Sequence, residues 1–283
     1  MKILYQNPFV YYNVCVMLNE IFNKPGNELF KDYVMMFEEN LIDKIGEIHK
    51  DGLKVIFYDM EHIFAADTNT LDSKIERFGN IAKRVDEFWT YSLENQKSLK
   101  NLGFDNVKFL PFRYTESLRK HFADLNETKG YNPPIDILFY GNMTQYRYDL
   151  IIKPLEELGL TFLTAHAVTG DKLDWLLINS KIILNTKSFE NYYNQNVVRS
   201  FYPVINNKCV LSQHSNDDHY MGDSIEYFTD GKDLKQKIIE LIVNDKWREI
   251  ALQAGEKYKA LSNSGDIWHT SDIEGVLNSR KQF

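Results

Sequence analysis

Short runs of β-branched and aromatic residues alternate along this chain with longer amphipathic stretches. This order predicts βαβ units, because two strands that pair in parallel need a crossover connection, usually a helix, between them. The first apolar run ends at Gln6-Asn7-Pro8. In the first part of the chain we expect strands at 3–5, 54–58, 88–91 and 107–110, and helices over 29–49, 75–85 and 94–102. The helix over 29–49 rests on near-helical spacing of Val34, Met35, Phe37 and Leu41.

The pattern weakens between about residues 112 and 134, where charged residues mix with Asn, Gly and a Pro133-Pro134 pair. Such a composition is typical of a connector between domains. We therefore expect an N-terminal α/β domain over 1–115, a linker over 116–134 and a second domain over 135–265. Residues 266–283 are expected either to return to the first domain or to fray as a terminus.

The alternation restarts in the second domain. We expect strands at 135–140, 161–163, 181–184, 209–212 and 225–228, and helices over 148–158, 172–179, 197–205, 234–241 and 247–261.

Composition places the chain among ordinary globular proteins, since 43% of its 283 residues are apolar and 26% are charged. The formal net charge of −7 counts against nucleic acid as a partner, because surfaces that bind it usually carry a surplus of Lys and Arg. No apolar stretch approaches the roughly 20 residues that a membrane-spanning helix needs. Peripheral contact with a membrane stays open.

The N-terminal run is too short for the apolar core of a signal peptide, so we expect a cytoplasmic protein. The two cysteines, Cys15 and Cys209, lie far apart in apolar surroundings and show no metal-ligand spacing. We expect both to be buried free thiols in a reducing compartment.

Five segments of the second domain have a characteristic order. They are DILFYGN (136–142), SKIILN (180–185), VRSFY (198–202), KCVLS (208–212) and FTD (228–230), followed by Asp233-Leu234, Asp245 and a helix with Ala251 and Gly255. In this order the region from about 135 to 261 resembles the C-terminal domain of GT-B glycosyltransferases, particularly small bacterial family-one-like and spore-maturation-type enzymes.

The resemblance implies two Rossmann-like domains that face each other across a cleft, with a nucleotide sugar held mainly by the second domain and an acceptor by the first. It also implies a hexosyltransferase that needs no metal ion and no cofactor beyond the nucleotide-diphosphate sugar as co-substrate. Many retaining members carry a Glu-x7-Glu motif, and alignment of that motif places Asn194 and Tyr202 at the two glutamates. This difference leaves both ribose recognition and the stereochemistry of transfer open.

The departing diphosphate must be stabilised, which backbone N–H groups, helix N-termini and cationic side chains can do without metal. We expect Gly141 and Asn142 to form a close-approach loop after a strand, with Arg147 nearby. Arg199, in the first turns of a helix, could pair with both phosphates through its planar guanidinium, and Lys187 could assist. The alternatives are a glycine needed only for the turn, and an arginine that faces solvent or pairs with an acid such as Glu190.

Asn194, Asn196 and Tyr202 are expected to bind ribose or sugar hydroxyls, because sugars need directional donors and acceptors. Simple turn chemistry explains a loop of this composition equally well.

Asp59, Glu61 and His62 follow the second expected strand, and in open α/β sheets that edge binds ligands. One of them could take the proton of the acceptor hydroxyl, although each could instead cap a helix or stay solvated. The Asn216–His219 loop is interpreted as a polar turn, so no metal site is expected.

Three functions remain in view. The first is transfer of a sugar to a hydroxyl of a glycan, a lipid-linked glycan or a protein. The others are glycosylation of modified DNA bases of phage type, and a non-catalytic nucleotide- or glycan-binding module.

Overall fold

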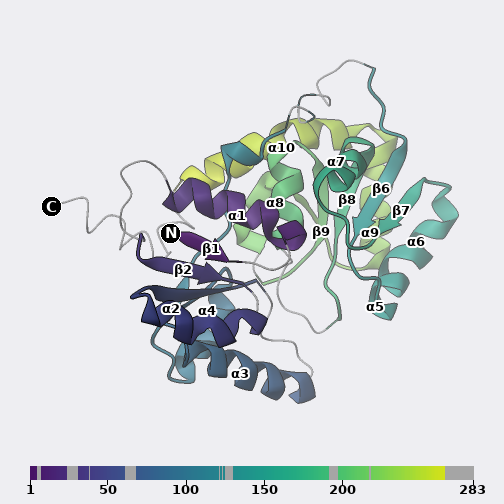
Figure 1. The fold of residues 1–283 in the computed structure, drawn as a ribbon. Helices are drawn as coiled ribbons and strands as arrows, with labels where there is room; N and C mark the ends of the chain where they lie inside the picture. Colours follow the sequence, from purple (N-terminus) through teal and green to yellow (C-terminus); the bar gives the residue numbers. More distant parts are fainter. Residues whose placement is uncertain are drawn as a thin grey trace. The chain divides into compact units, whose positions relative to one another are not determined.

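The computed structural model describes residues 1–4, 8–23, 31–37, 39–60, 68–120, 122, 124, 130–190, 197–216 and 218–264. The chain divides into two compact units, with the boundary between Phe112 and Arg113; the second unit runs to Ser262. Each unit contains a five-stranded sheet whose neighbouring strands are all parallel (Figure 1). The prediction of an α/β fold with two parallel sheets is confirmed.

In the first unit the strands lie side by side in the order of the sequence. They are β1 (Lys2–Leu4), β2 (Tyr33–Met36), β3 (Lys54–Asp59), β4 (Glu87–Thr90) and β5 (Val107–Phe109). The helices are α1 (Pro8–Phe22), a 3-10 turn at Glu39–Lys44, α2 (Ile45–Lys50), α3 (Thr68–Ala82) and α4 (Leu93–Asn101).

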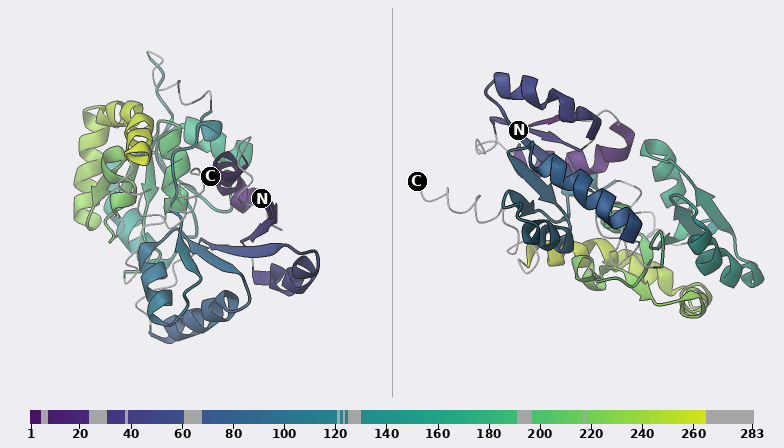
Figure 2. Two further views of the ribbon diagram at one scale, coloured as in Figure 1. Left: turned by 90° about the vertical axis from the view of Figure 1, so that its left-hand side faces the viewer. Right: turned by 90° about the horizontal axis from the view of Figure 1, so that it is seen from below.

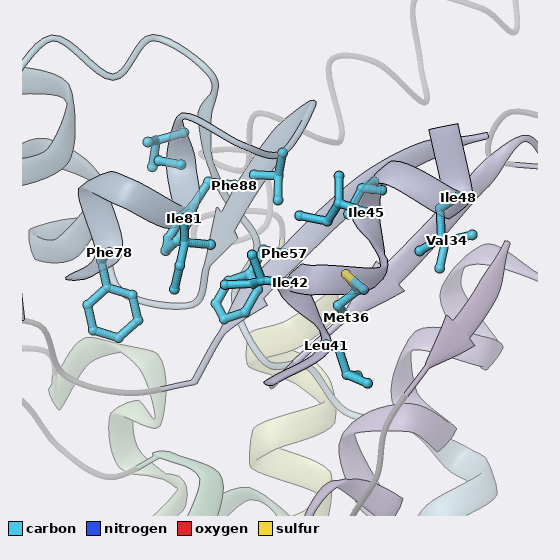
Figure 3. Packing of buried hydrophobic residues seen from close by; sticks show 14 of the residues in the cluster. Val34, Met36, Leu41, Ile42, Ile45, Ile48, Phe57, Phe78, Ile81 and Phe88 are labelled. Atoms are coloured by element: carbon cyan, nitrogen blue, oxygen red, sulfur yellow. The ribbon is translucent and has the colours of Figure 1, made fainter. Parts of the chain in front are cut away.

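The core of this unit is layered because successive residues of a strand point to opposite faces. Figure 3 shows one layer, in which Phe57 and Phe88 of the sheet meet Ile45 of α2 and Phe78 of α3. The next residue of β4, Trp89, points to the other face, and its ring lies 5.5 Å from that of Phe22 of α1.

The expected helix over 29–49 is wrong in its first part and confirmed from residue 39 onward. Tyr33–Met36 forms β2, which pairs with β1 and β3, and helical structure begins only at Glu39. Because Val34, Met35 and Met36 are buried on both faces of the sheet, every position of this run is apolar, and such a run fits a helical period as well as a strand. The sequence interpretation also missed α1, in which Pro8 occupies the first position, where a missing N–H is tolerated.

In the second unit the strands have the order β10-β9-β8-β6-β7. Their bounds are β6 (Ile135–Tyr140), β7 (Phe162–Ala165), β8 (Ser180–Asn185), β9 (Cys209–Gln213) and β10 (Glu226–Phe228). The chain moves from β6 outward to β7, then returns to the other side of β6 to add β8, β9 and β10. The order therefore reverses between β6 and β8, and ligands of open α/β sheets bind beyond the carboxyl ends of strands at such a point.

Helices cover both faces of the second sheet. α7 (Gly170–Ile178) and α8 (Val197–Ile205) lie on one face, while α6 (Lys153–Leu155), α9 (Gly231–Val243) and α10 (Lys246–Asn263) pack on the core of the other (Figures 1 and 2). The helix expected over 148–158 is a chain of short turns: it begins as α5 (Gln145–Arg147), continues as a π-helix at Tyr148–Ile152 and ends as a 3-10 turn at Glu156–Leu158.

Parts of the expected linker also belong to this unit. The side chain of Asn206, just after α8, donates to the carbonyl of Leu118 and accepts from the backbone N–H of Lys120. The expected terminal tail, 266–283, lies outside the described residues.

Both cysteines are buried free thiols, as predicted. Burial raises the pKa of Cys15 to about 12, so this thiol is not a nucleophile at neutral pH.

Candidate functional site

The candidate site lies at the carboxyl ends of β6 and β8, where the strand order of the second unit reverses. β6 is followed by Gly141 and Asn142, and β8 by Thr186 and Lys187. The sequence places polar residues directly after two buried apolar strands, and the parallel pairing of β6 with β8 brings both loops to one edge.

Arg147 ties the two loops together. Its Nε donates to the carbonyl of Lys187 at 3.0 Å, its Nη1 to Asn142 at 2.6 Å and its Nη2 to Thr186 at 2.8 Å. The side chain is buried, and Thr144 adds a hydrogen bond of 2.8 Å from its Oγ1 to the carbonyl of Ser188. Three nitrogens of Arg147 thus donate to backbone carbonyls of the two loops. The guanidinium therefore holds the loops together and places its positive charge at the carboxyl ends of β6 and β8. Its expected role as a phosphate ligand stays a prediction.

Arg199 is the third residue of α8 and lies over the same edge. Its Nη1 donates to Asn185 Oδ1 at 3.2 Å, and its guanidinium lies 5.4 Å from the centre of the Phe139 ring. Among the described residues no carboxylate forms an ion pair with it, Glu190 included. Burial lowers the pKa of the Arg199 guanidinium below its ordinary value. The site therefore contains a half-buried cation beside the first turn of a helix, where the helix dipole also favours an anion.

Two residues of the sheet hold Arg199 in position. Asn185 Nδ2 donates to the hydroxyls of Ser200 at 2.8 Å and Ser212 at 3.3 Å, which directs the amide oxygen toward the guanidinium. The hydroxyl of Tyr140 donates to the Arg199 carbonyl at 2.5 Å, and burial raises the pKa of this phenol, so it stays a donor. The backbone and the side chain of Arg199 are thus both fixed from the sheet.

Gly141 allows this arrangement. Its φ is +149°, a conformation that L side chains rarely adopt, and a Cβ added there would lie 2.6 Å from Arg199 Nη2. Both the backbone conformation and the close approach of the guanidinium therefore require glycine.

The structure brings together five of the sequence-predicted ligands: Gly141, Asn142, Arg147, Lys187 and Arg199. Tyr202 points elsewhere, because its hydroxyl donates at 2.5 Å to Asp174 of α7. The assignment of Tyr202 to ribose stays a prediction, and so does the assignment of the five clustered residues to the diphosphate. Asn194 and Asn196 lie outside the described residues.

The acceptor-side candidates lie in the first unit. Asp59, the last residue of β3, is buried and accepts from Asn95 Nδ2 at 3.1 Å and Thr90 Oγ1 at 3.5 Å. This carboxylate joins the carboxyl ends of β3 and β4 to α4. Glu61 and His62 lie outside the described residues.

Sequence reasoning missed Asn185 and Tyr140. The signal was present, because each residue ends a strand and carries a polar group directly after a run of three apolar residues. It also missed Gln213, whose Oε1 accepts from the Lys187 N–H at 3.2 Å and whose Nε2 donates to Tyr146 at 2.6 Å.

The described residues contain no group of three or more His, Cys, Asp or Glu side chains placed to hold a metal ion. None of their helices combines the length and the apolar composition needed to cross a bilayer.

No protein-family profile matches the sequence, and no curated protein sequence matches it. Solved structures do. Alr3699/HepE from Anabaena, in complex with UDP and glucose, matches with a TM-score of 0.57 and 12% identity over 88% of this chain and 78% of that chain. A UDP-forming α,α-trehalose-phosphate synthase from Burkholderia xenovorans matches with a TM-score of 0.52 and 11% identity over 94% and 77%. The corresponding synthase from Burkholderia vietnamiensis gives 0.55 and 9% over 96% and 76%.

These similarities define the class of fold. The chain has the α/β architecture of GT-B glycosyltransferases, with two parallel sheets. The expected GT-B resemblance is confirmed at this level.

Proposed function

We propose that the chain is a nucleotide-sugar-dependent glycosyltransferase whose donor diphosphate binds against Arg199 at the carboxyl ends of β6 and β8. The observation that carries the proposal is a half-buried guanidinium at a topological switch point, with neutral partners and no ion pair among the described residues. Desolvating a cation is unfavourable unless an anion compensates it, and a phosphate is the anion that a helix N-terminus and an arginine fork fit best.

The chemistry of this group suits a departing diphosphate. As the bond from the anomeric carbon to the phosphate oxygen breaks, negative charge grows on the leaving group. Arg199 is fixed by Asn185 and Tyr140 before the ligand arrives, so its charge needs little reorganisation during transfer. Arg147 adds a second positive charge within the same loops.

The solved structures support a nucleotide sugar as the donor. One of them contains UDP and glucose, and another is described as UDP-forming. For the present chain we propose only the class of donor, a nucleotide sugar, and no particular sugar or base.

On the acceptor side we propose a hydroxyl of a glycan, a lipid-linked glycan or a protein, with Asp59, Glu61 or His62 as the base that takes its proton. We also propose that transfer needs no metal ion. Activity that persists in EDTA would support metal independence, and activity lost in EDTA and restored by Mg²⁺ would contradict it.

A nucleotide panel tests the donor site. Thermal unfolding is followed with UDP, ADP, GDP, CDP and TDP, because a ligand present at 100 times its Kd stabilises the fold by about 2.7 kcal/mol. Arg199→Gln should weaken binding of the preferred diphosphate by about tenfold to a hundredfold, as expected for a hydrogen bond to a charged group. Turnover of the matching nucleotide sugars is measured next.

Arg248→Gln is the matched control. Like Arg199, Arg248 lies over an aromatic ring: its guanidinium is 4.5 Å from the centre of the Trp247 ring. It also donates to the carbonyl of Tyr131 at 2.6 Å. Tyr131 precedes β6, so this contact lies near the amino ends of the strands, away from the proposed donor site. Replacement of Arg248 should leave nucleotide affinity unchanged. Tight binding without turnover would favour a non-catalytic binding module, whereas no binding of any diphosphate would refute the proposed donor site.

A further inference from the structure

A histidine–carboxylate pair lies outside the residues assigned so far, next to β9. His214 follows the last residue of β9, and its Nδ1 lies 2.5 Å from Asp218 Oδ2. Asp218 Oδ1 accepts from both the backbone N–H and the hydroxyl of Ser215 at 2.9 Å. The carboxylate is therefore fixed before it orients the imidazole.

The ring of His214 is held by two further contacts. It stacks on Tyr227 of β10 with centroids 4.9 Å apart and planes 14° from parallel, and the Tyr227 hydroxyl donates to the Asp218 carbonyl at 2.7 Å. The His214 backbone N–H donates to the Phe228 carbonyl at 2.9 Å, which extends the pairing of β9 with β10. Because Nδ1 faces Asp218, Nε2 is the nitrogen left for a ligand; the side chain is exposed, and Nε2 forms no hydrogen bond or ion pair with the described residues.

The pair lies on the same face of the sheet as Asn185, the residue that accepts a hydrogen bond from Arg199. Ser212 is the register partner of Asn185, and both side chains join the network under α8. His214 is two residues beyond Ser212 and so shares its face. With strands about 4.8 Å apart and a rise of about 3.3 Å per residue, the Cα atoms of Asn185 and His214 are about 8 Å apart.

We propose that His214, oriented by Asp218, binds the second phosphate of the donor, so that Arg199 and His214 together select a nucleoside diphosphate over a monophosphate. This rests on the function proposed above. To reach both groups, a ligand with one anionic group at Arg199 places the second across β8, toward the carboxyl end of β9, where His214 stacks on Tyr227. The contact requires the imidazolium form, in which Nδ1–H donates to Asp218 and Nε2–H donates to a phosphate oxygen. Such a hydrogen bond is charge-assisted, and it adds to the arginine contact.

A second pair in the chain shows what a purely structural His–Asp contact looks like. His49 Nε2 lies 3.0 Å from Asp86 Oδ2, and the same oxygen accepts from the N–H of Val55 at 2.7 Å. Val55 is near the amino end of β3, the edge where ligands of parallel sheets do not bind. His49 is thus a matched control for His214.

The test compares the affinities of UDP and UMP by titration calorimetry. His214→Phe keeps a ring that can stack on Tyr227 but removes both nitrogens, and it should weaken UDP by about tenfold while leaving UMP unchanged. His214→Gln retains a neutral donor and should recover part of the UDP preference. His49→Gln should change neither affinity, and Arg199→Gln should weaken both nucleotides.

The ratio of the two affinities distinguishes a ligand contact from a structural effect. If His214→Phe weakens UDP and UMP equally, or neither, the inference is overturned although the proposed function stands. If His214→Phe does not fold, an unchanged UDP-to-UMP ratio in His214→Gln overturns it as well. If the wild-type protein prefers another base of the panel, the same comparison is made with that diphosphate and its monophosphate. Failure of the wild-type protein to bind any of the five diphosphates would overturn the assignment of Arg199 together with that of His214.

Discussion

Replacing Gly141 by alanine tests the geometry of the donor site with a single methyl group. The new Cβ would lie 2.6 Å from Arg199 Nη2 and 3.0 Å from its Cζ, so the guanidinium must shift away from Gly141. The backbone must also keep a φ of +149° with an L side chain or shift away from it.

Two free-energy terms follow from this geometry. A φ of +149° lies in a region that L residues sparsely populate, and holding one there destabilises the fold by about 1–3 kcal/mol. Moving the guanidinium breaks its hydrogen bond to Asn185, and a bond to a charged group contributes about 1.5–3 kcal/mol. Since a phosphate bound by Arg199 needs the guanidinium in this place, the second term corresponds to a loss of about tenfold to a hundredfold in affinity for the nucleoside diphosphate.

Gly159→Ala separates the two terms. Gly159 lies in the same unit and has a φ of +63°, but nothing lies within 4 Å of an added Cβ. Both variants should melt at lower temperature than the wild type, and calorimetric titration should show that only Gly141→Ala loses nucleotide affinity. If Gly141→Ala binds as tightly as Gly159→Ala, Arg199 in its present position is not the phosphate ligand.

Three further substitutions test the frame around the site. Arg147→Lys should destabilise the second unit by about 2–4 kcal/mol in urea titration, because one ammonium group cannot replace three nitrogens that hold two loops. An unchanged urea midpoint of unfolding would contradict that role. Gly255→Ala should destabilise by about 1–3 kcal/mol, since its Cβ would lie 2.5 Å from Asn207 Oδ1, whereas Gly46→Ala in α2 meets nothing within 4 Å and should be neutral or stabilising. Burial lowers the pKa of Lys208 to about 7, so from about pH 7 to 10 the unfolded chain holds the extra proton and stability rises with pH. Lys208→Met should remove up to about 1.4 kcal/mol per pH unit of that rise, and parallel curves for the two proteins would refute it.

The second unit could be predicted from the sequence more fully than the first. Its strands contain short apolar runs, and β8 and β9 end in the polar residues Asn185 and Gln213. The bounds 197–205 of α8, with Arg199 near its start, also followed from local patterns. The first unit defeated the same reasoning at Tyr33–Met36, where a strand buried on both faces leaves no period of two to detect.

Contacts between distant segments could not be predicted in this way. Tyr202 was assigned to ribose from alignment, but its partner Asp174 is 28 residues away on α7. The Asn216–His219 loop is a polar turn by its composition, and the sequence does not show that its Asp218 faces His214. Nor does it show that the pairing of β10 with β9 places Tyr227 against the His214 ring. Side-chain partners of this kind depend on sheet order, which a linear pattern does not contain.

The sheet order also explains why the site can place a cation in a partly buried position without neutralising it. Arg147 and Arg199 come from different loops, yet both guanidinium groups contact the Phe139 ring, at 5.2 and 5.4 Å. Taking these cations out of water is unfavourable, and the hydrogen bonds to carbonyls and to Asn185 offset this only in part because those partners are neutral. A carboxylate would stabilise the fold better, but it would also compete with a phosphate for Arg199. The neutral partners therefore orient the cation and leave its charge for the ligand, which is the arrangement that a site for a departing diphosphate requires.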